Sequence, residues 1–208
     1  MPAAPKSDYD VESHVFPPTR GLYLADAKLQ AEALPFPSWP PYIRYAFRHA
    51  RAKGLFCEFG VYMGGSLSHF IHTTPYHFHG FDSFIGLQEA WQGNPVGHLS
   101  LEGKLPKFKF GSRVTIHAGL FADIIPQFLA AYPEQIAFAH IDCDLYSSTK
   151  TILALLRPRL VSGSVLVFDE YITGEADERQ AFLEAGLPFR YLCHHVLGGS
   201  VAVQLTAG

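Results

Sequence analysis

Residues 137–171, AFAHIDCDLYSSTKTILALLRPRLVSGSVLVFDEY, decide the fold of this chain. The apolar run over 136–141 predicts a buried strand, a helical pattern follows it, and the apolar run over 164–168 predicts a second strand. Pro158 and Gly163 mark the turn between the helix and the second strand. Strand, helix and strand at this spacing indicate a right-handed crossover between parallel strands, and therefore an α/β sheet.

Each of these two predicted strands ends in acidic residues. Asp142 and Asp144 follow the first strand, and Asp169 and Glu170 follow the second. Neighbouring parallel strands point their carboxyl ends to the same edge of the sheet, which is the edge where open α/β sheets bind ligands. We therefore expect these acids to open onto a shared site.

The composition favours a globular α/β domain. The chain has 208 residues, of which 48% are hydrophobic and 17% are charged, so a well-buried core is expected. A net charge of -3 argues against a nucleic-acid partner, and no apolar window is long enough for a membrane span. The N-terminus lacks the layout of a signal peptide, and Cys57, Cys143 and Cys193 have no CxxC spacing. We expect free thiols in a reducing cytoplasm.

The first part of the chain is rich in proline. We expect 1–40 to form an arm that acts as a lid or an interface segment, ahead of the domain proper over 41–208. Within the arm, 21–34 has the composition of a short helix, and another helix should begin near Pro41, because proline is tolerated in the first turn. Packing of the arm or of the aromatic stretch 36–47 on a second copy would give a homo-oligomer.

A glycine-rich turn links the first core strand to a helix. The strand covers 55–60 and contains Glu58, and it is followed by Gly64, Gly65 and Ser66. Glycines allow a ligand to approach the backbone closely, and the N-terminus of a helix offers free N–H groups to an anion. The pattern is ExGxxxGxS rather than the dinucleotide fingerprint GxGxxG, which argues against a nicotinamide dehydrogenase.

Asp82 ends the second predicted strand, 77–82, and stands 24 residues after Glu58. A carboxylate at this place can accept both hydroxyl hydrogens of a ribose. The alternative is a turn aspartate that caps the residues after it. The stretch 83–110 has no clear periodicity, and long loops near a ligand edge tend to be lids or binding loops.

The remaining strands complete the predicted sheet. A third strand is predicted over 113–117, and after a helix over 176–185 two strands over 189–196 and 200–205 surround a Gly-Gly turn as a hairpin. We expect a seven-stranded, mostly parallel sheet with a C-terminal antiparallel hairpin and helices on both faces.

Four motifs, EFGVYMGGS, FDSFIGL, HIDCDLYSST and SGSVLVFDEY, occur in this order within about residues 54–172. Together they resemble the macrocin O-methyltransferase (TylF-like) family of class I S-adenosylmethionine-dependent methyltransferases. More distantly, the strand-end acids resemble the metal site of catechol O-methyltransferase. The resemblance implies a Rossmann-like class I methyltransferase fold.

The resemblance also implies a role for each motif residue in binding S-adenosylmethionine. The implied cofactor residues are Glu58, Gly60, Gly64 and Ser66 for the methionine part, Asp82 with Ser83 for the ribose, His117 to Gly119 for the adenine, and Asp142 as a further contact.

A divalent ion, with Mg²⁺ as the first expectation, is implied at Asp142, Asp169 and Glu170. Three converging carboxylates repel one another, and a hard cation relieves that repulsion. Oxygen-only ligands suit Mg²⁺, Ca²⁺ or Mn²⁺ rather than zinc. Such an ion would lower the pKa of an acceptor hydroxyl and orient it toward the methyl donor. The alternative is that these acids cap helices or face water.

The general base is less well defined by the motifs. Leu145 stands where catechol O-methyltransferases have a lysine. Asp144 is a candidate helper, and the resemblance to the sugar-modifying enzymes implies that Asp142 itself could take the proton. Three histidines are alternatives by chemistry alone: His98, His194 and His195.

The first hypothesis is an S-adenosylmethionine-dependent, Mg²⁺-assisted O-methyltransferase that acts on a hydroxylated small molecule, for example a sugar or another secondary metabolite. Two alternatives stay open: a methyltransferase that needs no metal, and a binding protein that kept the cofactor fold without turnover. The chain is short for the family, so its acceptor can differ from the sugar hydroxyls of macrolide antibiotics.

Overall fold

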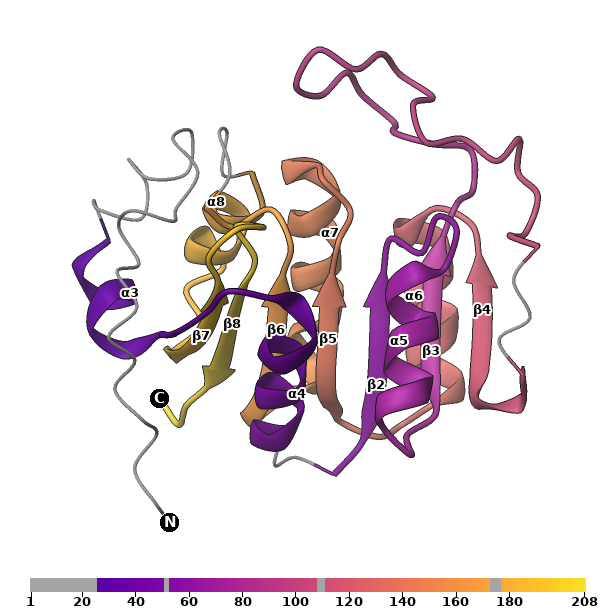
Figure 1. Cartoon of the computed structure of the whole chain (residues 1–208). Coiled ribbons are helices and arrows are strands. Elements are labelled where there is room, and N and C mark those ends of the chain that lie inside the picture. Colours follow the sequence, from indigo (N-terminus) through magenta and orange to yellow (C-terminus); the bar gives the residue numbers. More distant parts are fainter. Residues whose placement is uncertain (1–25, 51–52, 108–110, 173–176) are drawn as a thin grey trace.

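An eight-stranded sheet forms the centre of the structure, a computed structural model that describes residues 26–50, 53–107, 111–172 and 177–208. The strand order is β1-β7-β8-β6-β5-β2-β3-β4 (Figure 1). β8 runs antiparallel to β6 and β7, and every other neighbouring pair is parallel. The strands are β1 (Leu34–Phe36), β2 (Leu55–Phe59), β3 (Phe78–Asp82), β4 (Val114–Ala118), β5 (Ile136–Ile141), β6 (Leu160–Phe168), β7 (Phe189–His195) and β8 (Val201–Leu205).

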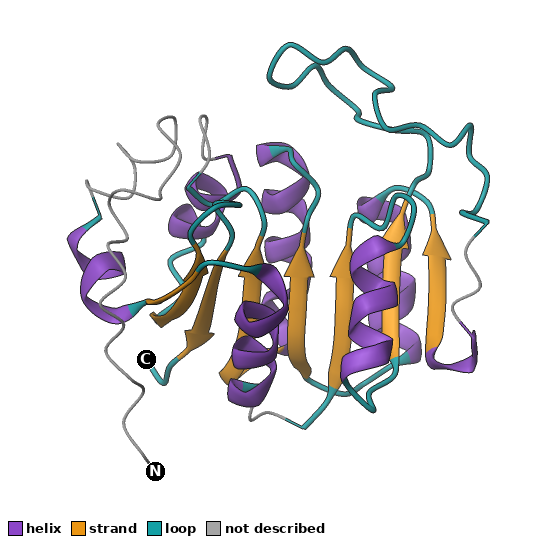
Figure 2. Cartoon of the chain, viewed as in Figure 1, coloured by secondary structure: helices purple, strands orange, loops and turns teal. Residues whose placement is uncertain are grey.

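Helices cover both faces of this sheet, as Figure 2 shows. Two of them, α4 (Trp39–His49) and α5 (Gly65–Thr73), pack with one apolar cluster, and α6 (Phe121–Ala131), α7 (Tyr146–Leu156) and α8 (Asp177–Glu184) pack with the other. The shorter helices are α3 (Ala27–Glu32), η1 (Gly111–Arg113) and η2 (Arg157–Arg159). The expected α/β fold, with its parallel sheet and C-terminal hairpin, is confirmed.

The central strands are continuous apolar runs because both of their faces are covered. Every residue of β2 and of β5 is buried. α4 begins one residue after Ser38 with prolines in its first turn, where the missing N–H groups cost nothing. Its buried face carries Tyr42, Ile43, Ala46 and Phe47, at helical spacing.

The eighth strand, β1, departs from the expectation of seven. It pairs in parallel with β7, from Leu34 opposite Cys193 to Phe36 opposite His195. Pro35 argues against a strand in the sequence, because proline cannot donate to a ladder hydrogen bond. At the edge of a sheet that donor is not needed, so the short strand is tolerated.

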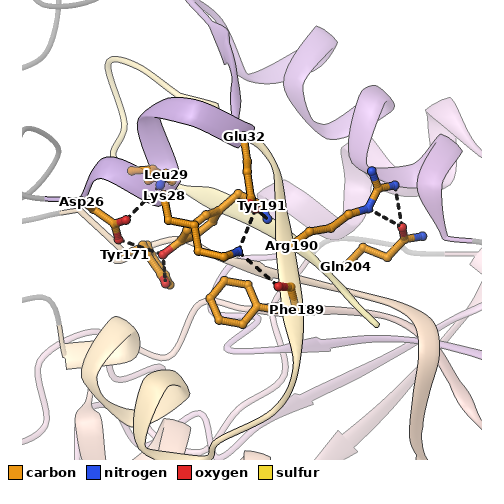
Figure 3. Close-up of polar contacts among 9 residues, drawn as sticks. All are labelled: Asp26, Lys28, Leu29, Glu32, Tyr171, Phe189, Arg190, Tyr191 and Gln204. Carbon is orange, nitrogen blue, oxygen red and sulfur yellow. Dashed lines mark hydrogen bonds and ion pairs between the residues drawn. The ribbon is translucent and has the colours of Figure 1, made fainter. Parts of the chain in front are cut away.

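Polar contacts anchor α3 to β7 (Figure 3). Asp26 caps α3 by accepting the N–H of Leu29 at 2.9 Å, and it also accepts the hydroxyl of Tyr191 at 2.8 Å. Glu32, at the other end of α3, accepts the backbone N–H of Tyr191 at 2.8 Å. Residues 26–36, which the sequence places in the arm, therefore pack on the sheet edge.

The three cysteines, Cys57, Cys143 and Cys193, are buried and unpaired. Burial raises the pKa of each thiol, so these side chains act as small apolar groups rather than nucleophiles. Within the described ranges, no helix has the length and apolar character needed to cross a membrane.

Candidate active site

A cavity of about 800 Å³ opens at the carboxyl ends of the parallel strands. Residues at the ends of five strands line it: Gly60, Asp82, Gly119, Asp142 and Asp169. A cavity of this volume can hold a cofactor-sized ligand. The cavity therefore lies at the sheet edge where the sequence predicts the ligand site.

The glycine turn brings the end of β2 against the end of β5. Gly60 has a φ of 92°, and a Cβ at this position would lie 1.7 Å from the carbonyl oxygen of Asp142. Glycine is thus required by backbone packing. Gly64 caps the start of α5 with a φ of 81°, whereas a Cβ on Gly65 would meet nothing within 4 Å. Gly65 and Ser66 line the cavity.

Asp82 holds the glycine turn in place and also lines the cavity. Its Oδ2 accepts the backbone N–H groups of Val61 at 2.8 Å and Tyr62 at 2.7 Å, and its Oδ1 accepts that of Phe84 at 2.7 Å. Ser83 lies beside it in the cavity wall. The capping alternative is therefore realised. Oδ2 already accepts two N–H groups, and the lone pair that remains on Oδ1 can still accept a ligand hydroxyl.

His117 lies outside the cavity, although the sequence places it beside the adenine. Its ring stacks on Phe81 with 4.6 Å between centroids, and its Nε2 lies 3.1 Å from Nδ1 of His79. Alternate residues of a strand face opposite sides of the sheet, and His117 faces the α6 side against Phe128. The cavity wall next to β4 is instead formed by residues 119–122.

Three aspartates line one side of the cavity: Asp142, Asp144 and Asp169. Burial, and then the charge of Asp169, raise the pKa of Asp142 well above its ordinary value. Burial also raises the pKa of Asp144 to about 6. Asp144 has a φ of 64°, a strained conformation of the kind that clusters at functional sites. The hydroxyl of Ser200, which the sequence did not single out, donates to Oδ1 of Asp169 at 2.6 Å.

Glu170 does not line the cavity, although Asp169 before it does. Consecutive residues at the end of a strand tend to point in different directions, and the role of Glu170 as a metal ligand stays a prediction. The histidines considered as bases, His98, His194 and His195, do not line it either. Asp144 is therefore the catalytic candidate, besides Asp142, that reaches the cavity.

A buried pair of side chains lies next to Asp142. Nδ1 of His140 is 2.9 Å from Oε1 of Glu58, and the two side chains are 1% and 0% exposed. Together with Asp142 they bring three candidate ligand atoms within 4.8 Å of one another. The sequence reasoning missed His140, although it precedes Asp142 by two strand positions and so shares its face.

The charge state of this pair follows from its surroundings. Burial would lower the pKa of His140, but the hydrogen bond to Glu58 and the negative charges of Asp142 and Asp169 raise it to about 9. Burial raises the pKa of Glu58, against the hydrogen bond from His140. The pair therefore shares one titrating proton. We place it on His140, because further acids surround the ring, so that an imidazolium faces the carboxylate of Glu58. The sequence indicated only repulsion among the acids, and this imidazole adds a basic group beside them.

Glu178, on α8, is a second buried residue that the sequence reasoning missed. It is 0% exposed, and its two oxygens accept the backbone N–H groups of Cys143 at 3.2 Å and Glu170 at 3.0 Å. Burial raises its pKa well above the ordinary value, and these backbone hydrogen bonds oppose that shift. The sequence of α8 is polar, so nothing in it indicates that the carboxylate of Glu178 is buried.

The loop that follows β3 covers the cavity from the side. Gly86, Leu87 and Leu99 line the cavity. The loop is attached to the helices by two side-chain contacts, from Ser147 Oγ to Glu89 Oε1 at 2.6 Å and from Trp91 Nε1 to Asp177 Oδ2 at 3.0 Å. The long loop therefore forms part of the cavity wall.

A family model described as a methyltransferase domain matches residues 57–171. Among solved structures, the chain is similar to CalS11, named as a TDP-rhamnose 3'-O-methyltransferase of calicheamicin biosynthesis, at 26% identity over 79% of this chain and 78% of that chain, with a TM-score of 0.59. The O-methyltransferase NovP is 20% identical over 81% and 78% of the two chains, with a TM-score of 0.56.

MycE of the mycinamycin pathway, in complex with Mg, SAH and mycinamycin VI, is 16% identical over 80% of this chain and 49% of that chain, with a TM-score of 0.52. These likenesses to NovP and MycE concern the fold alone. No curated protein sequence matches the chain.

Proposed function

The chain belongs to the methyltransferase domain family, whose model matches residues 57–171. From that premise we propose that it is a magnesium-assisted O-methyltransferase for a small hydroxylated molecule. One observation carries the proposal: a single cavity is lined both by the glycine turn after β2 and by Asp142, Asp144 and Asp169. The first group suits S-adenosylmethionine, and the second suits a divalent ion beside an acceptor hydroxyl.

The residues that line the cavity fit S-adenosylmethionine. The start of α5 has no side-chain cap, and the open space at Gly65 leaves its backbone N–H groups accessible to a carboxylate. Nε2 of His140, which is buried and has no hydrogen-bond partner among the described residues, lies in the same wall. We assign the methionine part of the cofactor to the cavity wall at the start of α5 and His140. We assign the ribose to Asp82 and Ser83, and the adenine to residues 119–122 in place of His117.

The acids fit a hard divalent cation. Burial, and then the charge of Asp169, raise the pKa of Asp142, and a cation bound by the two carboxylates would offset both effects. Carboxylate oxygens are the ligands that Mg²⁺ prefers. We assign the ion to Asp142 and Asp169, with Glu170 as the third predicted ligand now less favoured, because it is not among the residues that line the cavity.

When bound, S-adenosylmethionine supplies an activated methyl group and Mg²⁺ supplies positive charge at an acceptor oxygen. Asp144 would take the proton of the acceptor hydroxyl on a carboxylate oxygen. Its pKa of about 6 keeps it ionised near pH 7 and makes it a stronger base than an ordinary aspartate. Leu87 and Leu99 in the loop wall would exclude water, and the glycine turn would keep the methionine part in line with the acceptor.

The acceptor class is proposed from the similar structures. CalS11 is named as a TDP-rhamnose 3'-O-methyltransferase, and the MycE structure contains mycinamycin VI. On this basis we propose a sugar hydroxyl on a secondary metabolite as the acceptor, and membership of the narrower TylF-like group that the four sequence motifs resemble.

A metal-independent methyltransferase is the second candidate, and His140 is the observation that favours it. With its pKa raised to about 9, this imidazole is a built-in cation that partly offsets the acids around it. The acids would then only bind the cofactor and the acceptor through hydrogen bonds.

Calorimetric titration of S-adenosylhomocysteine into the protein, with Mg²⁺ and then with a chelator, tests the proposal. We expect micromolar binding, and turnover of an accepted hydroxyl compound that is lost with the chelator and in Asp142→Ala and Asp169→Ala. Full activity in the chelator would favour the metal-independent candidate. Absence of S-adenosylhomocysteine binding in both conditions would overturn the proposed function.

A further inference from the structure

Glu178 ties together the two turns that carry the cavity acids. Cys143, whose N–H donates to Oε1, directly follows Asp142, and Glu170, whose N–H donates to Oε2, directly follows Asp169. The donor–acceptor distances are 3.2 Å and 3.0 Å. One side chain from α8 therefore contacts the backbone immediately beyond both acids.

These contacts replace hydrogen bonds that the sheet no longer provides. The ladder between β5 and β6 ends where the N–H of Asp169 donates to the carbonyl of Ile141 at 3.0 Å. The N–H of Asp142 still donates to the carbonyl of Phe59 at 2.8 Å, so the first N–H groups that need acceptors outside the sheet are those of Cys143 and Glu170. Glu178 supplies both, and so fixes the separation of the two turns.

A glutamate is an unfavourable choice for this position unless its two oxygens are needed. The side chain is 0% exposed and lies near Asp169, whose charge opposes another carboxylate. Glutamine has the same shape but offers one acceptor oxygen and one NH₂ donor. Its NH₂ group would therefore point at one of the two backbone N–H groups, which is also a donor. Aspartate is one methylene shorter and cannot span both turns.

We propose that Glu178 is a positioning residue that sets the distance between Asp142 and Asp169, and with it the affinity of the site for a divalent cation. This inference rests on the proposed metal-assisted function. Groups that orient metal ligands commonly change metal affinity by about 10- to 100-fold when they are replaced.

The test is calorimetric titration of Mg²⁺ into the protein saturated with S-adenosylhomocysteine, for the natural chain, Glu178→Gln and Glu178→Asp. We expect both variants to bind Mg²⁺ about 10- to 100-fold more weakly while their affinity for S-adenosylhomocysteine stays within about twofold. The spectrum of bound Mn²⁺ in electron paramagnetic resonance should change in the same variants. Glu184→Gln is the matched control and should bind Mg²⁺ normally. Glu184 lies on the same helix, but its exposed side chain contacts Tyr146 and Lys150.

Unchanged Mg²⁺ affinity in folded Glu178→Gln, or an equal loss in Glu184→Gln, would overturn the inference and leave the proposed function intact. Absence of Mg²⁺ binding by the natural chain would overturn the metal assignment itself, and the inference with it. If both Glu178 variants fail to fold, hydrogen exchange on the natural chain decides. The amides of Cys143 and Glu170 should exchange slowly, and more slowly with Mg²⁺, whereas unprotected amides would overturn the proposal.

Discussion

The imidazole of His140 donates to the carboxylate of Glu58, with 2.9 Å between Nδ1 and Oε1 and both side chains buried. The two residues are 82 positions apart and lie on the neighbouring strands β5 and β2. Asp142 completes a group whose ligand atoms lie within 4.8 Å of one another. A buried cation therefore stands directly beside the acids that face the cavity.

This pair predicts a loss of stability at alkaline pH. The pKa of His140 is raised to about 9 in the folded protein, above its ordinary value near 6.5. A raised histidine pKa contributes stability that is fully present below about pH 6.5 and is lost as the pH rises through about 9. The melting temperature should fall across this window, by an amount equivalent to on the order of 3 kcal/mol.

His140→Gln is the control for this pH dependence. Its amide can still donate to Glu58 but cannot titrate, so the slope between pH 6.5 and 9 should flatten relative to the natural chain. The measurement is thermal unfolding followed by circular dichroism at several pH values. An unchanged slope in His140→Gln would show that other groups cause the pH dependence.

Asp142→Asn should stabilise the metal-free protein and abolish stabilisation by Mg²⁺. Burial and the charge of Asp169 raise the pKa of Asp142, so its ionised form costs folding free energy near pH 7.5. Relieving that cost should add about 1 kcal/mol, or roughly 2–4 °C in melting temperature. Differential scanning fluorimetry with and without Mg²⁺ measures both effects.

Asp123→Asn, an exposed change in the first turn of α6, is the matched control for Asp142→Asn. It should leave the response to Mg²⁺ unchanged and cost a few tenths of a kcal/mol, because it removes a negative charge near a helix N-terminus. A Mg²⁺-induced shift that survives in Asp142→Asn would contradict the metal assignment.

The sheet could be read from the sequence because its strands are short apolar runs separated by turn signals. β5 and β6 end where Asp142 and Asp169 interrupt the apolar run, so the strand ends and the site edge follow from the same residues. β1 could not be read in this way, because Pro35 argues against a strand and only the edge position, a tertiary property, permits it.

The cavity acids were predictable from their order along the chain, whereas their partners were not. Glu178 lies 35 residues after Cys143 on a helix with a polar sequence, and nothing local marks it as buried. His117 illustrates the opposite error: its position at the end of β4 was read correctly, but the direction of its side chain depends on which face of the sheet each strand residue takes.

Asp144→Asn should remove turnover while leaving the fold and cofactor binding intact. Asparagine tolerates the left-handed backbone, here with a φ of 64°, but it cannot accept a proton at neutral pH. With any acceptor that the natural chain methylates, we expect kcat to fall by about 10²- to 10⁴-fold. S-adenosylhomocysteine affinity should stay within about twofold by calorimetry.

The natural chain should show the matching pH profile. Because the base must be ionised, kcat should rise as the pH passes through about 6, the raised pKa of Asp144. A profile that is flat in this region, or an Asp144→Asn variant with normal kcat, would assign the proton transfer to another group.

Gly60→Ala and Gly65→Ala should separate packing from ligand binding within one turn. At Gly60, with a φ of 92°, a Cβ would lie 1.7 Å from the carbonyl oxygen of Asp142, and the backbone of β5 cannot move away. We expect a loss of roughly 2–6 kcal/mol in the free energy of unfolding, from strain and overpacking together. At Gly65 a Cβ meets nothing within 4 Å, so alanine should be neutral or stabilise the protein by about 0.4–1 kcal/mol.

Gly93→Ala isolates the backbone term in this comparison, because Gly93 has a φ of 83° but open space around it. Its cost should be about 1–2 kcal/mol, clearly below that of Gly60→Ala. Urea unfolding measures all three variants. S-adenosylhomocysteine should bind less tightly to Gly65→Ala, since Gly65 lines the cavity and a methyl group there would occupy cofactor space, and normally to Gly93→Ala. Normal binding by Gly65→Ala would move the methionine part of the cofactor away from the start of α5.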